Sequence, residues 1–416
     1  MVERTEEGML SPYRVLDLTN EIGILCGKLL GDLGADVIKV EKPGGDPVRN
    51  MGPFYHDEPD PEKSLFWFAF NTSKRGITLD IETADGQEIF QKLVKTADFV
   101  VESFPVGYMD KLGLGYPALE KINPRIIVVS VTPFGQTGLH KDYKDPGIVT
   151  WAMSGFMSGR GDADRAPVQI SHHAQTFLHA AVEGAVGAML ALFDRWTTGE
   201  GQHVDVSVQE SAGRGTPPFG WVMGRMRVPR GMGQPGTAGL RTRYLWQCKD
   251  GHILWFYATG QQGKRMSLPL VQWMEEEGMA GDFIKEIDWD TFDLTKVTQE
   301  TVNRMIESTE GFFKAHTKAE LFEGAVKRRI LLYPVSTAKD IVESPQLAER
   351  EFWVEVEHPE LGEFITYPGP FANVIGCPLT ISRRAPLIGE HNEEIYEKEL
   401  GISKKKLKAL KLAKVI

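Results

Sequence analysis

The sequence predicts an α/β protein with a parallel, doubly wound sheet and a second, smaller domain. Strand-like and helix-like runs alternate through the first third of the chain, which is the order expected of a parallel sheet with crossover helices. Between residues 222 and 333 the amino-acid composition changes. A stretch rich in glycine, arginine, methionine and proline is followed by acidic sequence with helical periodicity. The length of 416 residues and an apolar content of 42% are ample for two hydrophobic cores.

The first three expected elements form one βαβ unit. Residues 13–18 are a short apolar run typical of a buried strand. Residues 22–33 have helical periodicity and stop at Gly34, a residue that commonly terminates helices. Residues 35–41 predict the second strand.

The same pattern recurs further along the chain. Strands are expected at residues 77–80, 99–101 and 126–130. The helix between the first two has one apolar face, formed by Ile89, Phe90, Leu93 and Val94. The repetition of strand and helix indicates that the sheet is parallel and doubly wound.

We expect a large domain whose first part spans residues 1–222, a small domain at residues 223–333, and a return to the large domain with C-terminal helices at residues 334–416. The small domain contains a predicted hairpin at residues 245–256, with Lys249, Asp250 and Gly251 as its turn. At the C-terminus, lysines and leucines alternate over residues 404–414, which favours a solvated amphipathic helix.

The charge balance excludes some classes of partner. The chain has 47 Lys and Arg against 57 Asp and Glu, a net charge of -10, which argues against a nucleic-acid surface. Residues 1–7 are acidic and lack the apolar core of a signal peptide. The apolar stretch at residues 180–193 contains Glu183 and is expected to be too short to span a bilayer. We therefore expect no membrane segment and a cytoplasmic location.

Cysteine and histidine usage does not indicate a metal site. The three cysteines, Cys26, Cys248 and Cys377, lie far apart in the sequence, so neither a disulfide framework nor structural zinc is expected. His172 and His173 are adjacent and would project to different sides, and no nearby carboxylate or cysteine completes a ligand set. The predicted metal content is none.

Five segments carry motifs in a recognisable order. They are VLDLT at residues 15–19, LGADVIKVE at 33–41, FNTSKRGI at 70–77, TGEGQ at 198–202 and APLIGEH at 385–391. Together they resemble the class III CoA-transferases, the formyl-CoA transferase-like or CaiB/BaiF family. The resemblance implies a Rossmann-like large domain, a smaller α+β domain, and two chains threaded through each other as interlocked rings.

The resemblance also implies a nucleophilic aspartate, which this chain lacks. In the family that carboxylate attacks an acyl-CoA donor, forms a mixed anhydride, and then carries CoA as a thioester to an acceptor carboxylate. Counting back from Gly187 places the position at Phe177, and counting forward from Pro167 places it at Thr176. Neither side chain can do this chemistry. We therefore expect no catalytic residue here and predict the non-catalytic subunit of a heteromer whose homologous sister chain supplies the aspartate.

Two other interpretations remain open. A homodimeric CoA-transferase could use a relocated carboxylate, and Glu21 is the candidate because family members often carry a glutamine there. Glu183 is a poorer candidate, since it follows Phe177 by six positions, about 240° around a helix. The third interpretation is a non-enzymatic protein that binds CoA thioesters.

A coenzyme A site needs cations for phosphates and a flat apolar surface for adenine. By their place in the family pattern, the candidates are Lys42, Ser103, Phe104, Lys111 and Lys144. The family often has arginine at the first two cationic positions, and lysine keeps the charge but loses the two-pronged hydrogen bonding.

A glycine-rich segment completes the expected site. Its members are Gly231, Gly233, Gln234 and Gly236, which match a family loop that closes over the reacting thioester and lets backbone N–H groups approach it. The expected substrates are an acyl-CoA donor such as succinyl-CoA and a carboxylic acid acceptor such as benzylsuccinate.

Overall fold

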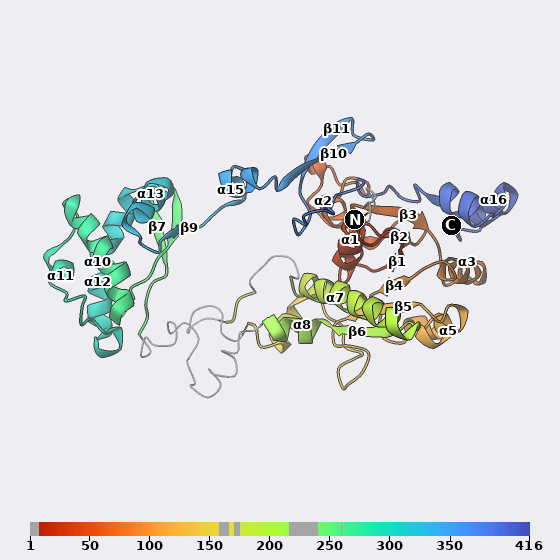
Figure 1. The fold of residues 1–416 in the computed structure, drawn as a ribbon, viewed down its shortest axis with the longest axis horizontal. Coiled ribbons are helices and arrows are strands. Elements are labelled where there is room, and N and C mark those ends of the chain that lie inside the picture. Colours follow the sequence, from red (N-terminus) through yellow and green to blue (C-terminus); the bar gives the residue numbers. More distant parts are fainter. Residues whose placement is uncertain (1–7, 158–165, 170–174, 216–239, 259) are drawn as a thin grey trace. The chain divides into compact units, whose positions relative to one another are not determined.

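The computed structural model describes residues 8–157, 166–169, 175–215, 240–258 and 260–416 (Figure 1). These residues group into two compact units. The first contains residues 8–156, 175–215 and 346–416, and the second contains most of residues 240–345. Each unit has its own hydrophobic core.

The first unit is built on a six-stranded sheet in which every neighbouring pair is parallel. Its strands are β1 (Arg14–Leu18), β2 (Asp36–Glu41), β3 (Lys74–Thr78), β4 (Phe99–Glu102), β5 (Ile127–Thr132) and β6 (His203–Ser207). The strand order is β3-β2-β1-β4-β5-β6, so the order reverses between β1 and β4. The predicted doubly wound α/β fold is confirmed.

Helices cover both faces of this sheet (Figure 1). On one face α1 (Ile24–Asp32) and α7 (Gln175–Thr198) pack in one core with the strands. On the other face lie α3 (Ala84–Val94), α5 (Tyr116–Ile122) and α16 (Lys404–Leu412). The remaining elements of this unit are η1 (Pro47–Asn50), η2 (Tyr55–Asp57), α2 (Leu65–Asn71), α4 (Tyr108–Lys111), α6 (Ile148–Met153), α8 (Val208–Gly215), α15 (Pro345–Glu349), η4 (Glu394–Glu399) and the antiparallel pair β10 (Trp353–His358) and β11 (Glu363–Pro368).

Helix α3 illustrates how local sequence fixes an element. The Thr83 side chain caps its N-terminus by accepting a hydrogen bond from the backbone N–H of Gly86 at 3.0 Å, which satisfies an otherwise unpaired donor. The four residues predicted to form its apolar face are all buried against the sheet. Asp85 in the first turn and Lys92 in the last complement the helix dipole.

Strand β3 begins earlier than predicted. We expected it at residues 77–80, whereas it runs from Lys74 to Thr78 with all five residues buried. Lys74 is buried because its ammonium pairs with Asp17 at 2.7 Å, and Arg75 because it pairs with Asp36 at 2.7 Å. Hydrophobic periodicity cannot anticipate charges that are buried by ion pairing.

Helix α7 is longer than its apolar stretch suggested. It has 24 residues, and by length and composition it is able to cross a membrane, so the expectation that it is too short is wrong. Half of its most apolar 18-residue window is buried within the unit, where α7 packs on α1, α8, β5 and β6. This is the packing of a core helix.

The second unit is α+β. Its antiparallel sheet contains β7 (Leu245–Cys248), β8 (Gly251–Leu254) and β9 (Tyr333–Pro334), and the first two form the predicted hairpin. Aromatic side chains dominate its core, among them Trp246, Trp255, Trp273, Phe312 and Phe313. Its helices are α10 (Gly260–Glu276), α11 (Asp282–Lys285), η3 (Leu294–Lys296), α12 (Gln299–Ala315), α13 (Lys318–Arg328) and α14 (Ala338–Val342).

We predict that Lys74→Met lowers the free energy of unfolding by about 3–5 kcal/mol, because it removes one partner of a buried ion pair. The Lys74 ammonium also donates to the carbonyl of Ile24 at 2.9 Å and to Asn71 Oδ1 at 3.0 Å. Urea denaturation measures the change. Lys92→Met is the control, since Lys92 forms an exposed pair with Glu88 that contributes at most about 1 kcal/mol. Equal effects of the two substitutions would contradict the prediction.

Candidate functional site

The carboxyl edge of the large sheet holds the first of the predicted site residues. In doubly wound sheets, ligands bind where the strand order reverses, which here is between β1 and β4. Ser103 follows β4 and joins the two loops at this point: its Oγ accepts from the Asn20 backbone N–H and donates to Asn20 Oδ1, both at 2.9 Å. Ser103 is thereby buried and serves to position the loops.

An aromatic pair lies next to Ser103. Phe104 stacks on Tyr108 with ring centroids 4.6 Å apart and planes 30° from parallel. The Tyr108 hydroxyl donates to Glu82 at 2.6 Å, and Glu82 also pairs with the Lys42 ammonium at 2.9 Å. A chain of contacts through Glu82 and Tyr108 therefore connects the two predicted residues Lys42 and Phe104. Neither Glu82 nor Tyr108 was predicted from the sequence.

The other two predicted lysines are solvent-exposed. Lys111 is the last residue of α4, and Lys144 precedes the turn at Asp145. Neither forms an ion pair with another residue of the described part of the chain. Asp145 itself is fully engaged, because its carboxylate accepts from the Gly147 N–H at 2.7 Å and from the Thr150 hydroxyl at 2.5 Å. The two lysines are thus available to an incoming anion.

The two positions expected for the nucleophile are buried at the start of α7. Phe177 packs in the core between α7 and the sheet. Thr176 is fully buried, and its Oγ1 lies 3.3 Å from that of Thr150. Glu183 accepts from Ser211 Oγ at 2.7 Å and from Arg214 at 3.0 Å, so it connects α7 to α8.

Glu21 lies in the loop that follows β1 and is half-buried. Burial raises the pKa of Glu21 above its ordinary value, and the nearby Asp46 carboxylate adds to this shift. Glu21 is therefore partly shielded from water and lies close to a second carboxylate.

Some predicted positions cannot be placed. Gly231, Gly233, Gln234 and Gly236 lie outside the described residues, as do His172 and His173. Within the described ranges, no group of three or more His, Cys, Asp or Glu side chains is arranged to hold a metal ion.

Glu102, the last residue of β4, is a titratable group that the sequence analysis did not single out. It lines a cavity of about 410 Å³ together with Met109, Tyr116, Ser130, Lys141 and His203. Burial raises the pKa of the Glu102 carboxyl to about 7, against the lowering effect of hydrogen bonds from Ser130 and from the Phe104 N–H. The latter bond is 2.7 Å long, so Glu102 directly supports the segment that carries the aromatic pair.

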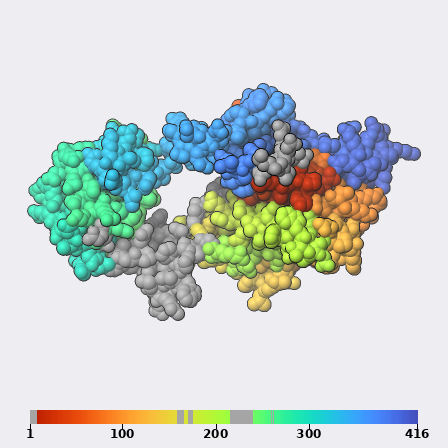
Figure 2. Space-filling model, in the orientation of Figure 1, coloured from red at the N-terminus to blue at the C-terminus, as the bar shows by residue number. Residues whose placement is uncertain are grey.

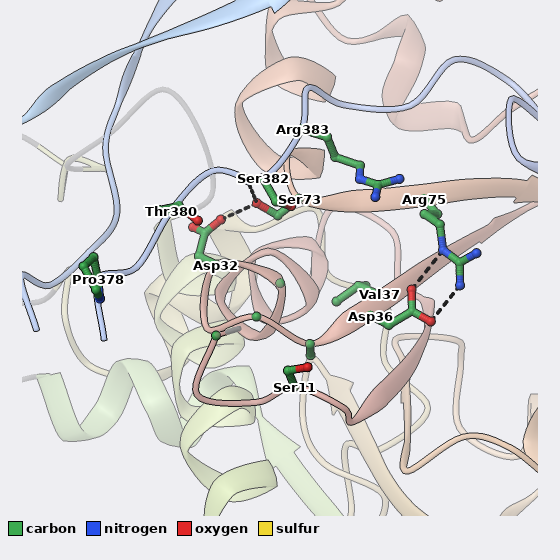
Figure 3. Close-up of a pocket in the computed structure, with 14 residues that line it drawn as sticks. Ser11, Asp32, Asp36, Val37, Ser73, Arg75, Pro378, Thr380, Ser382 and Arg383 are labelled. Carbon is green, nitrogen blue, oxygen red and sulfur yellow. Dashed lines mark hydrogen bonds and ion pairs between the residues drawn. The ribbon is translucent and has the colours of Figure 1, made fainter. Parts of the chain in front are cut away.

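A second cavity, of about 560 Å³, contains none of the predicted residues (Figure 3). It adjoins the amino end of β2, whereas Lys42 follows the carboxyl end of that strand. Its polar groups largely satisfy one another: Asp32 accepts from Ser73 Oγ at 2.8 Å, and Asp36 pairs with Arg75. We assign no function to it.

We predict that Glu102 makes the fold less stable as pH rises. Since the folded pKa of Glu102 is about 7 and its ordinary value is 4.5, the folded chain retains a proton between these pH values that the unfolded chain releases. The free energy of unfolding should then fall by about 3 kcal/mol over this window. In urea denaturation, Glu102→Gln should be more stable than wild type at pH 8 by about that amount and nearly equal at pH 4.5. A difference that does not vary with pH would refute this prediction.

Comparison of the sequence with known proteins identifies its family. The profile of CoA-transferase family III matches residues 10–392. The chain is 37% identical to succinyl-CoA:(R)-benzylsuccinate CoA-transferase subunit BbsE of Thauera aromatica, covering 92% of this chain and 93% of that protein. It is 31% identical to the formyl-CoA:oxalate CoA-transferase of Streptomyces coelicolor, covering 98% of this chain and 99% of the relative.

A solved structure of the same family has a similar fold. A CaiB/BaiF family protein from Brucella suis is 27% identical and superposes with a TM-score of 0.79, covering 94% of this chain and 99% of the other. The match spans both units, so the similarity is not confined to the parallel sheet. The family expected from the motifs is therefore confirmed, and this chain belongs to CoA-transferase family III.

Proposed function

We propose that this chain is a subunit of a class III CoA-transferase and works with a homologous sister chain that supplies the catalytic aspartate. The main support for the proposal comes from the start of α7. There, the two positions expected for the nucleophilic aspartate are occupied by the buried side chains of Thr176 and Phe177. The sequence has no aspartate between Arg165 and Asp194. The likeness to BbsE, a protein named as a subunit, supports assembly with another chain.

The reaction needs a carboxylate at this position. The carboxylate oxygen attacks the thioester carbon of the donor, the C–S bond breaks, and CoA leaves as a thiolate. The thiolate then attacks the enzyme's side of the resulting anhydride, which releases the donor acid and leaves CoA on the enzyme as a thioester. A phenylalanine ring has no lone pair to begin this sequence. A threonine hydroxyl would give an ordinary ester, which is much less reactive than an anhydride.

The proposed coenzyme A site lies on the first unit. Phe104 and Tyr108 offer an aromatic surface for adenine, and Lys42 is a cation beside it. Lys111 and Lys144 are exposed cations for the remaining phosphate charge, and Ser103 holds the loops. By analogy with BbsE, we propose succinyl-CoA as donor and benzylsuccinate or a related acid as acceptor.

The outer face of α7 supports assembly with a partner chain. We use this term for Val182, Val186, Leu190, Phe193 and Trp196, which are between 43% and 67% exposed. Their spacing places them on one side of the helix, and Figure 2 shows this yellow-green part of the chain at the surface of the first unit. A contiguous exposed apolar surface of this kind marks an interface. The proposed occupant is the sister chain, which has the same fold.

We predict that Phe193→Glu prevents copurification of the co-expressed chains, because it places a charge at the most exposed residue of the outer face of α7. Affinity purification through a tag on one chain, followed by size-exclusion chromatography, measures assembly. Phe322→Glu is the control, since Phe322 is an exposed phenylalanine of α13 in the second unit. Assembly that tolerates Phe193→Glu as well as the control would show that the interface lies elsewhere.

We also predict that the isolated chain forms no acyl-enzyme. With succinyl-CoA and hydroxylamine it should trap no adduct, whereas the assembled complex should. Removing the sister's aspartate should lower kcat by at least about 10³-fold. Glu21→Gln in this chain should change kcat by less than about threefold, and so should Phe177→Leu, which preserves the apolar core. A large loss of kcat with Glu21→Gln would favour the relocated carboxylate instead.

A further inference from the structure

The Lys42 ammonium is already paired in this structure. Its Nζ lies 2.9 Å from Glu82 Oε1, and the same oxygen accepts the Tyr108 hydroxyl at 2.6 Å. Both members of the ion pair remain accessible, since the Lys42 and Glu82 side chains are 54% and 47% exposed. An anion that approaches Lys42 from solvent therefore finds its charge already compensated by the Glu82 carboxylate.

Local structure holds the Glu82 backbone in place. Glu82 lies between β3 and α3, and its N–H donates to Asp80 Oδ1 at 3.0 Å. The next residue, Thr83, caps α3. The hydrogen bond from Tyr108 and the interaction with Lys42 lower the pKa of Glu82, so its carboxylate is ionised at neutral pH.

The contact with Tyr108 gives Glu82 a second role. Burial and the Glu82 carboxylate raise the pKa of Tyr108, so its hydroxyl stays protonated and donates. The bond fixes Tyr108 at the distance at which its ring stacks on Phe104. The same carboxylate therefore supports the aromatic surface and neutralises the cation beside it.

We infer that Glu82 tunes the affinity of the proposed coenzyme A site: it competes with a CoA phosphate for Lys42 while it holds Tyr108 against Phe104. This inference rests on the proposed function. A phosphate that reaches Lys42 has to displace Glu82 or bind beside a like charge. The carboxylate thus lowers the affinity for CoA, and the penalty is greatest at low ionic strength, where charges at the surface are least screened.

Glu82→Gln separates the two roles. The amide has nearly the same shape, and its oxygen can still accept the Tyr108 hydroxyl, but it carries no charge. In calorimetric titrations of the full chain, the Kd for CoA should fall by about 3- to 10-fold at low salt, and the gain should shrink at high salt. The affinity for pantetheine, which has no phosphate, should not change. Glu82→Ala should gain less, since it also releases Tyr108.

Two controls test the assignment to Lys42. Glu58→Gln makes the same change in net charge, because Glu58 is an exposed carboxylate paired with Lys63, and it should leave the Kd for CoA unchanged. Combining Glu82→Gln with Lys42→Met should abolish the gain, because the cation that the phosphate would use is gone.

The outcomes are distinguishable. If the wild-type chain binds CoA and Glu82→Gln leaves the Kd equal or makes it larger, the inference about Glu82 is wrong and the coenzyme A site stands. If the gain appears equally with pantetheine, charge competition with a phosphate is also wrong. If neither chain binds CoA, the proposed site fails and the inference fails with it.

Discussion

Three charged side chains from adjacent strands, Asp17 of β1, Lys39 of β2 and Lys74 of β3, are completely buried, and the packing of these strands depends on their mutual attraction. Burying an unpaired charge this deeply would lower the free energy of unfolding by more than the fold can tolerate. Burial raises the pKa of Asp17, but the two lysines outweigh it, so the pKa of Asp17 lies below its ordinary value and the carboxylate stays ionised. The cost of burial is offset only if all three strands keep their register.

The same charges position the loops that carry the candidate site. The Lys39 ammonium donates to the carbonyl of Thr19, in the loop that leads to Glu21. It also lies 3.3 Å from Asp46, in the loop that begins at Lys42. The buried charge network therefore connects the core of the sheet to the proposed coenzyme A site.

The sequence anticipated most of the large domain because its strands and helices follow hydrophobic periodicity, as the four apolar positions of α3 illustrate. It failed where ion pairing overrides that pattern, as at Lys74 and Arg75 in β3. Strand ends and the family pattern singled out Ser103, Phe104 and Lys42, which the structure places near the carboxyl ends of β4 and β2, and their role in binding CoA stays a prediction. Glu82 and Tyr108 were missed because their contact depends on how distant segments approach. The depth of Glu102, and hence its pKa, likewise follows from tertiary packing.

In the proposed heteromer, the outer face of α7 would have a consequence for the amounts of the two chains in the cell. A chain made in excess of its partner presents that apolar surface to water, where it invites aggregation and engagement by chaperones and proteases. Removal of the unassembled excess would bring the amounts of the two chains into balance without regulation of either gene. The stoichiometry of the proposed complex would then follow from an exposed apolar helix surface.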